Sequence, residues 1–223
     1  MDTIILKDIS KSYEGKVVLD SFNITFSKDK INCIVGESGG GKTTLLNIIS
    51  NLIEKDKGEI IGDFKRDISY IFQEDRLIPW LTVEGNLKLT LSAYYKGKEL
   101  DKRIDYVLNL ISGTAWKKEY PEKLSGGMKQ RVNIARGLGK DSKVLLMDEP
   151  FKSLDYKTKL LIMRDLKKIL ENEDRIIIFV THDLDECIFF EGRVFVLGGK
   201  PLKIKGVFEG DLAKEKETII DLL

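Results

Sequence analysis

Residues 36–43 combine a run of glycines with a lysine and a hydroxyl side chain, in the order GESGGGKT. This order matches G-x-x-x-x-G-K-[ST] and lies between an apolar run and a helical pattern. Glycines allow backbone N–H groups to curl around a phosphate, which the positive end of the following helix also attracts. Lys42 would then reach the β- and γ-phosphates of a nucleotide, and the Thr43 hydroxyl would ligate Mg²⁺. The pattern favours a phosphate site over an ordinary glycine-rich turn.

Two adjacent carboxylates are a second candidate for chemistry. Asp148 and Glu149 follow the apolar run at 144–147, at the carboxyl edge of a predicted sheet, where ligands bind. Asp148 suits the Mg²⁺ shell, and Glu149 is placed to polarise a water that attacks the γ-phosphate. Two adjacent acids are equally common in an ordinary turn. The functional interpretation of this pair therefore depends on the predicted phosphate loop.

An α/β fold with a mainly parallel central sheet is predicted to position these groups. Four short apolar runs, at 31–35, 68–72, 144–147 and 176–180, are typical of strands buried on both faces. Helical patterns lie at 43–52, 104–111, 128–138 and 159–170. This alternation predicts the α/β class, and the loop at 36–43 points to the P-loop NTPase type within it. An α/β domain of another purpose would show the same alternation.

Two regions depart from the alternation. Residues 3–6, 16–19 and 22–26 are predicted to form an antiparallel β-subdomain of short strands, with turns around residues 14–15 and at Asp20. Residues from about 74 to 124 are mostly helical and are interpreted as an inserted α-helical subdomain. We therefore expect one domain, 1–223, whose nucleotide-binding core comprises residues 1–73 and 125–223, with a terminal helix near 212–223.

Composition narrows the class of protein. The 37 Lys and Arg against 36 Asp and Glu give a net charge of +1, which argues against a protein that coats nucleic acid. Cys33 and Cys187 show no metal-ligand spacing, which fits a reduced, intracellular compartment. The first residues lack a signal-peptide pattern, and no stretch approaches the roughly 18 apolar residues that cross a bilayer. We expect a soluble chain that can dock onto a membrane component.

Residues 124–131, in the order LSGGMKQR, resemble the signature motif of ATP-binding cassette (ABC) ATPases, with methionine where glutamine is commoner. Other motifs follow in the family's order. Tyr13 resembles the aromatic residue that stacks on adenine, and Gln73 resembles the Q-loop glutamine. His182 resembles the switch histidine. The D-loop motif is matched by Ser153, Leu154 and Asp155. Each motif alone has a plainer interpretation, such as a surface tyrosine or a helix N-cap. The complete set in the right order favours the family, and the resemblance extends from residue 3 to residue 200.

The resemblance implies that two copies enclose two ATP molecules, with the signature of one copy facing the γ-phosphate held by the other. It implies ATP and Mg²⁺ as cofactors. The implied catalytic residues are Lys42, Gln73, Glu149 and His182, and the implied metal ligands are Thr43, Gln73 and Asp148. ATP would be held by Tyr13, Gly36, Glu37, Ser38, Gly39, Gly40, Gly41, Lys42, Thr43 and Thr44. The partner's ATP would meet Leu124, Ser125, Gly126, Gly127 and Met128. The sequence departs from the family at Gly40, where serine is common, and at Lys152, where a small residue is common.

Among the classes of ABC ATPases, the sequence fits a transporter subunit. Chromosome-maintenance and repair members insert hundreds of coiled-coil residues between phosphate loop and signature, and translation-factor members carry two cassettes. This sequence has neither feature. In transporter cassettes, the segment equivalent to residues 74–86 docks the membrane partner. Its LIPWLTV run resembles importers of the nitrate, sulfonate, taurine and thiamine-precursor group.

We therefore expect a small-solute importer whose permease contacts Leu77, Pro79 and Trp80. The alternative is that Pro79 and Trp80 simply pack the helical subdomain. The expected partners are a second copy, permease subunits and, indirectly, a substrate-binding protein, at the cytoplasmic face of the cell membrane; nucleic acid is not expected. An exporter or lipoprotein-release cassette, or a non-transport ABC ATPase in DNA repair or translation, stays as an alternative. The chain does not identify the transported substrate.

Overall fold

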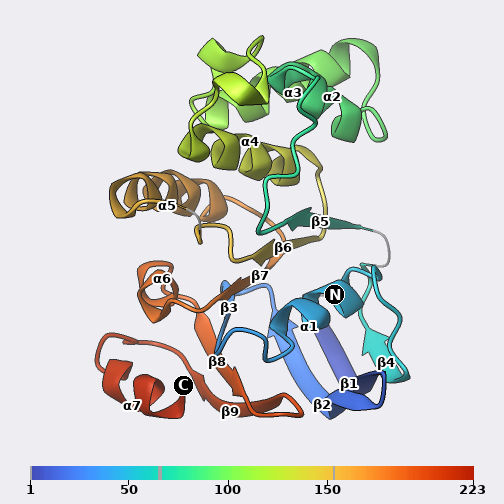
Figure 1. Ribbon diagram of the computed structural model, residues 1–223, viewed down its shortest axis with the longest axis vertical. Coiled ribbons are helices and arrows are strands. Elements are labelled where there is room, and N and C mark those ends of the chain that lie inside the picture. The colour runs from blue at the N-terminus through green and yellow to red at the C-terminus, as the bar shows by residue number, and fades with distance from the viewer. Residues whose placement is uncertain (1, 65–66, 153) are drawn as a thin grey trace. The chain divides into compact units, whose positions relative to one another are not determined.

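The chain divides into two compact units. Figure 1 shows the helices and strands in a computed structural model, which describes residues 2–64, 67–152 and 154–223. The first unit contains residues up to 68, residues 146–149 and residues 174–223. The second contains residues 69–145 and 150–173. Each unit is built from segments that lie far apart in the sequence.

A mainly parallel sheet runs through the first unit. Its strand order is β6-β7-β3-β8-β9. The strands are β3 (Asn32–Val35), β6 (Val144–Asp148, of which residues 146–148 belong to this unit), β7 (Ile176–Thr181), β8 (Arg193–Gly198) and β9 (Lys203–Phe208). β3 pairs in parallel with both β7 and β8, whereas β9 runs antiparallel to β8. Every residue of β3, β6 and β7 is buried, which explains their continuous apolar sequences.

A second sheet in this unit is antiparallel, with the order β2-β1-β4. Its strands are β1 (Thr3–Tyr13), β2 (Lys16–Ser27) and β4 (Lys57–Ile61). The predicted turn at residues 14–15 is confirmed, but the predicted turn at Asp20 is wrong. Between the pairs Ile9–Phe22 and Lys11–Leu19, β2 holds one residue more than β1, and Ser21 has a φ of +46°. A bulge therefore takes up the extra residue and β2 continues as one strand.

Helices complete the first unit. They are α1 (Lys42–Ile49), α6 (Leu184–Phe189) and α7 (Lys216–Leu222). The predicted helix at 43–52 ends earlier, because Asn51 has a φ of +59°, and the predicted terminal helix at 212–223 is shorter. The buried face of α1 carries Leu45, Leu46, Ile48 and Ile49.

The second unit is mostly helical. It contains β5 (Ile68–Ile71, from residue 69), α2 (Val83–Leu91), α3 (Gly97–Leu110), α4 (Gly126–Gly139), α5 (Tyr156–Leu170) and two short 3₁₀ turns, Thr114–Trp116 and Pro121–Lys123. The core between α2, α3 and α4 includes Leu87, Leu91, Ile104, Val107 and Val132. Over the part of the chain that the structure describes, no helix has the length and apolar character that spanning a membrane requires.

Candidate nucleotide site

The predicted phosphate loop connects β3 to α1 and depends on glycine at two positions. A Cβ atom at Gly36 would lie 2.0 Å from the carbonyl oxygen of Leu197, so no side chain fits there. Gly41 has a φ of +105°, and a Cβ atom there would lie 2.7 Å from Cγ1 of Val18. Residues other than glycine rarely adopt such a conformation. The path of the loop therefore requires glycine both for space and for its dihedral angles.

The side chain of Lys42 folds back over the loop that precedes it. It is only 4% exposed, and its Nζ donates hydrogen bonds to the carbonyl oxygens of Gly36 and Glu37, each at 2.7 Å. Lys42 also begins α1, whose first turn holds no acidic residue and whose N-terminal end attracts anions. The ammonium and the helix end thus gather positive charge where a phosphate group can bind.

A pocket of about 240 Å³ opens at this loop. Tyr13, at the end of β1, and Glu149, just after β6, line it together with loop residues. Three parts of the predicted site that are distant in sequence are therefore close in space. Sequence analysis did not identify Val18, an apolar residue of β2 that carries no motif. The lining residues are Tyr13, Val18, Gly39, Gly41, Lys42, Thr43, Thr44 and Glu149. Of the other loop residues, Glu37 and Ser38 are exposed and Gly40 is half-buried.

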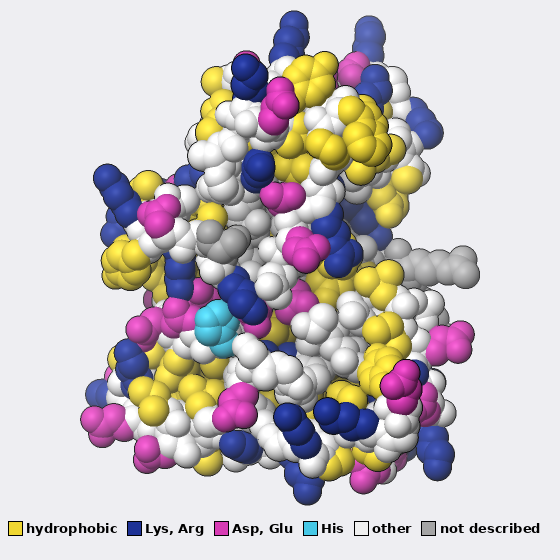
Figure 2. Space-filling view, viewed as in Figure 1, with side chains coloured by type: hydrophobic (Ala, Val, Ile, Leu, Met, Phe, Trp, Pro, Cys, Tyr) yellow, Lys and Arg dark blue, Asp and Glu magenta, His cyan; other side chains and the backbone are white. Residues whose placement is uncertain are grey.

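The Glu149 carboxylate contacts the predicted switch histidine. Its Oε2 lies 3.2 Å from Nδ1 of His182. The Glu149 side chain is 8% exposed and that of His182 is 46% exposed; Figure 2 shows this single histidine, in cyan, open to solvent. Glu149 has a φ of +44°, and its backbone N–H donates to the carbonyl oxygen of Val180 at 2.9 Å. Strained backbone held by its surroundings is common at functional sites. Asp148, the preceding residue, is buried at the end of β6.

A hydrogen-bond network fixes the chain around His182. The Thr181 hydroxyl donates to Oε2 of Glu186 at 2.7 Å and accepts from the backbone N–H of Asp183 at 3.0 Å. Thr181 and Glu186 are buried, 1% and 4% exposed. Sequence analysis missed both residues. Nothing in the sequence marks Glu186, which follows Asp183 and Asp185 in the first turn of α6; its burial, which requires a partner for the carboxylate, is visible only in the structure.

The signature residues begin α4 in the second unit. Ser125 is the N-cap, and its Oγ accepts a hydrogen bond from the backbone N–H of Met128 at 3.3 Å. The plainer interpretation of Ser125 as a helix cap is therefore realised. Ser125 and Gly126 are exposed, Leu124 is buried, and Met128 packs against the core of α2 and α3. A Cβ atom at Gly127 would lie 2.4 Å from Cγ2 of Thr158 on α5, so glycine lets α4 and α5 approach closely.

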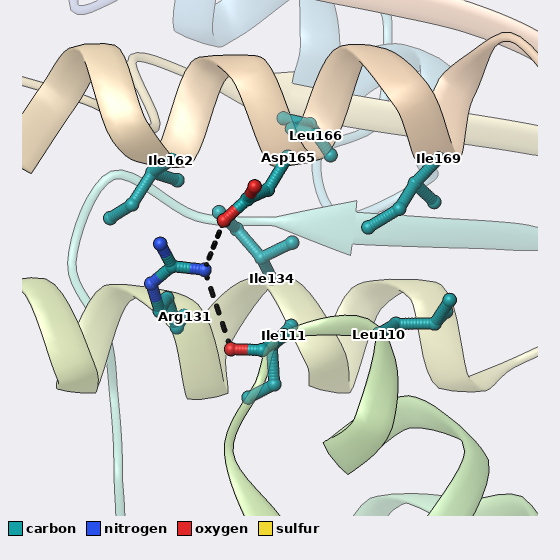
Figure 3. Close-up of a pocket in the computed structure, with 8 residues that line it drawn as sticks. All are labelled: Leu110, Ile111, Arg131, Ile134, Ile162, Asp165, Leu166 and Ile169. Atoms are coloured by element: carbon teal, nitrogen blue, oxygen red, sulfur yellow. Dashed lines mark hydrogen bonds and ion pairs between the residues drawn. The ribbon is translucent and has the colours of Figure 1, made fainter.

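Further along, an ion pair joins α4 to α5. Nη1 of Arg131 lies 2.7 Å from Oδ2 of Asp165 and also donates to the carbonyl oxygen of Ile111 at 3.3 Å, as Figure 3 shows. The small cavity around it is otherwise lined by the apolar residues Leu110, Ile111, Ile134, Ile162, Leu166 and Ile169. The pair and the Gly127 contact fix the start of the signature helix to α5.

The predicted D-loop precedes α5. Ser153 lies outside the described residues. Leu154 is half-buried, and Asp155 is the N-cap of α5, with Oδ1 accepting from the backbone N–H of Thr158 at 3.0 Å. Hydrogen bonding to Thr158 lowers the pKa of Asp155 below its ordinary value. The departure at Lys152 leaves an exposed side chain beside the buried Phe151.

Gln73 and the expected permease contacts also lie in the second unit. Gln73 is exposed immediately after β5 and Phe72. Leu77 is partly buried against the helical core, whereas Pro79 is exposed and Trp80 is 75% exposed. The alternative in which Trp80 packs the helical subdomain is therefore wrong.

Comparisons with known proteins show what the chain is similar to. The family model described as ABC transporter matches residues 19–152. The chain is 39% identical, over 94% of its length and 87% of the relative, to a Bacillus cereus protein named aliphatic sulfonates import ATP-binding protein SsuB. It also resembles the dimeric ATP-binding cassette MJ0796 bound to ADP and Pi, with 31% identity, a TM-score of 0.81, and coverage of 92% of this chain and 98% of that one. The protein cbiO1 from Clostridium perfringens, at 24% identity and a TM-score of 0.85, covering 100% of this chain and 95% of that one, shares the fold.

Proposed function

Because the chain belongs to the family of ABC transporter ATP-binding proteins, we propose that it powers a small-solute importer, in which ATP closes a homodimer that acts on a separate permease. The chain is an ATP-binding subunit of a transporter, and its activity is the hydrolysis of ATP. The observation that carries the proposal is the pocket that joins the phosphate loop, Tyr13 and Glu149, with His182 in contact with the Glu149 carboxylate.

The arrangement of these side chains suits the attack of water on the γ-phosphate. The buried Lys42 ammonium neutralises the β- and γ-phosphates, and the Tyr13 ring stacks on adenine. Glu149 accepts a proton from the attacking water, because its carboxylate lines the same pocket as the phosphate loop. His182 orients that carboxylate through the 3.2 Å contact. Positioning of the attacking water and electrostatic stabilisation of the phosphate oxygens are the main contributions that a protein makes to such a reaction.

Oxygen donors at the site fit Mg²⁺, which prefers hydroxyl, carboxylate and carbonyl oxygens. Thr43 is exposed in the pocket beside Lys42, and Asp148 is buried directly before Glu149. We infer that these two residues hold the ion. Gln73, which belongs to the second unit, is proposed as a further ligand from the family resemblance alone. When bound, the ion would offset negative charge on the phosphate oxygens.

The start of α4 supports a site completed by a second copy. Ser125 and Gly126 are exposed at the N-terminus of α4, and a helix N-terminus attracts anions. We propose that this helix start contacts ATP bound to the partner copy. The other residues proposed to surround that ATP are Leu124, Gly127, Met128 and the D-loop residues Ser153, Leu154 and Asp155. The dimeric cassette among the similar structures supports this assembly. In this proposal residues 1–73 and 125–223 act as the nucleotide-binding core and residues 74–124 as the helical subdomain.

Two features support the proposal that the transporter is an importer: the name of a relative and an exposed side chain in the second unit. The relative from Bacillus cereus is named as an import protein, and Trp80 presents a large, exposed apolar surface of the kind that anchors protein partners. We propose that Leu77, Pro79 and Trp80 contact a permease and hold the chain at the cytoplasmic face of the membrane.

Replacing Glu149 with glutamine tests the catalytic proposal. The variant keeps the shape of the side chain but loses its negative charge, so ATP should bind without being hydrolysed. Bound γ-phosphates should then keep the dimer closed. We expect a homodimer with ATP and a monomer with ADP in size-exclusion chromatography with light scattering, at high protein concentration. Adding Ser125→Glu should return the ATP-bound variant to a monomer, because the new carboxylate repels the partner's phosphate.

The matched control is Glu171→Gln, an exposed acid at the end of α5, which should hydrolyse ATP normally. Full ATP hydrolysis by the Glu149→Gln protein would refute the role of Glu149. ATP-dependent dimers that persist with Ser125→Glu would refute the composite site.

A further inference from the structure

The backbone on both sides of Gln73 is tied to the middle of α4. Before Gln73, the carbonyl oxygen of Phe72 accepts a hydrogen bond from Nδ2 of Asn133 at 2.9 Å. After Gln73, the carbonyl oxygens of Asp75 and Arg76 accept from Nη2 and Nη1 of Arg136, at 2.8 and 2.9 Å. Residues three apart on a helix lie on one face. One turn of α4 therefore holds the chain before and after Gln73.

The two anchoring side chains also support each other. Nη2 of Arg136 donates to Oδ1 of Asn133 at 3.0 Å, which leaves the Asn133 amide nitrogen oriented toward Phe72. Asn133 is fully buried. Burial lowers the pKa of the Arg136 guanidinium, while the Asp75 carboxylate acts in the opposite direction; a guanidinium nonetheless stays charged in proteins. A half-buried, charged donor with carbonyl partners is costly to remove, because the partners lose their hydrogen bonds.

The loop is also closed on itself. The Arg76 guanidinium lies 4.0 Å from the centre of the Phe72 ring, and that ring stacks on Tyr70 at 4.1 Å. Arg76 has a φ of +46°, an uncommon conformation for a residue with a side chain. The Gln73 side chain is exposed at the tip of this closed loop. Its backbone is thus restrained from both sides, whereas its amide can reach a ligand.

We propose that Arg136, together with Asn133, is a positioning residue for Gln73. The inference rests on the proposed role of Gln73 at Mg²⁺. Without Arg136, the carbonyls of Asp75 and Arg76 lose their anchor and Gln73 samples many positions.

The test compares ATP hydrolysis by the full chain as a function of Mg²⁺ concentration. Removing a group that orients a metal ligand typically reduces metal affinity or activity by roughly 10- to 100-fold. We expect Arg136→Met to raise the Mg²⁺ concentration for half-maximal turnover, or to lower the maximal rate, within that range. Affinity for Mg²⁺-free ATP should change by less than about 3-fold, because the phosphate loop belongs to the other unit. Arg136→Lys should fall between, since lysine keeps the charge but not the two-pronged geometry. Arg164→Met, an exposed arginine of α5, should behave as wild type.

Two readouts separate positioning from a general structural defect. The double variant Gln73→Ala/Arg136→Met should be no slower than Gln73→Ala alone, because Arg136 acts through Gln73. In hydrogen exchange, amides of residues 72–77 should exchange faster in Arg136→Met while those of α4 stay protected. Should Arg136→Met fail to fold, Arg136→Lys and Asn133→Asp serve for the same measurements.

The outcomes also separate the inference from its premise. Wild-type Mg²⁺ dependence in a folded Arg136→Met, beside a defect in Gln73→Ala, would overturn the positioning role. Losses that multiply in the double variant would do the same. Wild-type Mg²⁺ dependence in Gln73→Ala would instead overturn the role of Gln73 itself, and with it the inference.

Discussion

Alanine is expected to be tolerated at Gly40 and damaging at Gly41, although the two glycines are adjacent in the phosphate loop. A Cβ atom at Gly40 would lie 3.4 Å from the carbonyl oxygen of Glu37 and 3.6 Å from Cδ1 of Leu202, which is ordinary contact. At Gly41 the φ is +105°, and the Cβ atom would lie 2.7 Å from Cγ1 of Val18. The added methyl group therefore fits at Gly40 and collides with Val18 at Gly41.

The magnitudes follow from these contacts. Holding alanine in a sparsely populated backbone conformation costs about 1–3 kcal/mol, and forcing a methyl group into a packed neighbour costs about 1–3 kcal/mol more. Gly41→Ala should therefore lose at least about 2 kcal/mol, or roughly 4–8 °C in Tm for a chain of this size. Gly40→Ala should gain about 0.4–1 kcal/mol, because alanine restricts the unfolded chain.

Thermal unfolding and ATP calorimetry on both variants measure these effects. We expect ATP affinity to fall by about 10-fold or more in Gly41→Ala, because a loss of roughly 1.4 kcal/mol in binding free energy from the distorted loop corresponds to that factor. In Gly40→Ala, ATP affinity should stay near wild type. Val18→Ala in the Gly41→Ala background should recover part of the lost stability by removing the collision. Equal effects at the two glycines would refute the requirement for glycine at Gly41. No recovery with Val18→Ala would refute the collision with Val18 and leave the backbone conformation as the cause.

Two further predictions concern the second unit. Trp80→Ala should weaken assembly with a permease in pull-down experiments while leaving ATP affinity and Tm near wild type, since the side chain is 75% exposed; an unfolded variant would contradict the surface role. The lowered pKa of Asp155 means that its charged form adds stability above its ordinary value of 3.8, and that this stability is lost as pH falls through the lower folded pKa. The stability advantage of wild type over Asp155→Asn, measured by urea unfolding from about pH 7 to about pH 2.5, should shrink below about pH 3.8; an advantage that is constant with pH would show that the charge does not contribute.

Local patterns were enough to predict the elements that carry the phosphate loop and Glu149. Strands β3, β6 and β7 are fully buried, so their apolar runs are continuous and easily distinguished from helices. The loop that follows β3 is a contiguous motif, and Glu149 directly follows β6. Chemistry that is encoded by neighbours in sequence is visible without the fold.

Contacts between distant residues could not be predicted in the same way. Val18 reaches Gly41 only because β2 passes the phosphate loop, and nothing in its own sequence marks it. The bulge at Ser21 resembles a turn, since both need a residue with positive φ. Asn133 and Arg136 look like ordinary polar residues of a helix, and their significance comes from the carbonyls of a loop that lies 61 and 60 residues earlier in the chain.

The position of β3 between β7 and β8 has a consequence for protein synthesis. Asn32 on β3 donates to the carbonyl oxygen of Ile177, 145 residues later in the chain, so the strand that leads into the phosphate loop leaves the ribosome long before either neighbour exists. At about 5–20 residues per second, that interval is roughly 7–29 seconds. During it the apolar strand has unpaired edges on both sides, where chaperones can bind or chains can aggregate. We therefore expect a nascent chain to bind ATP stably only after residues 176–198 have been made, because β3 pairs with β7 and β8.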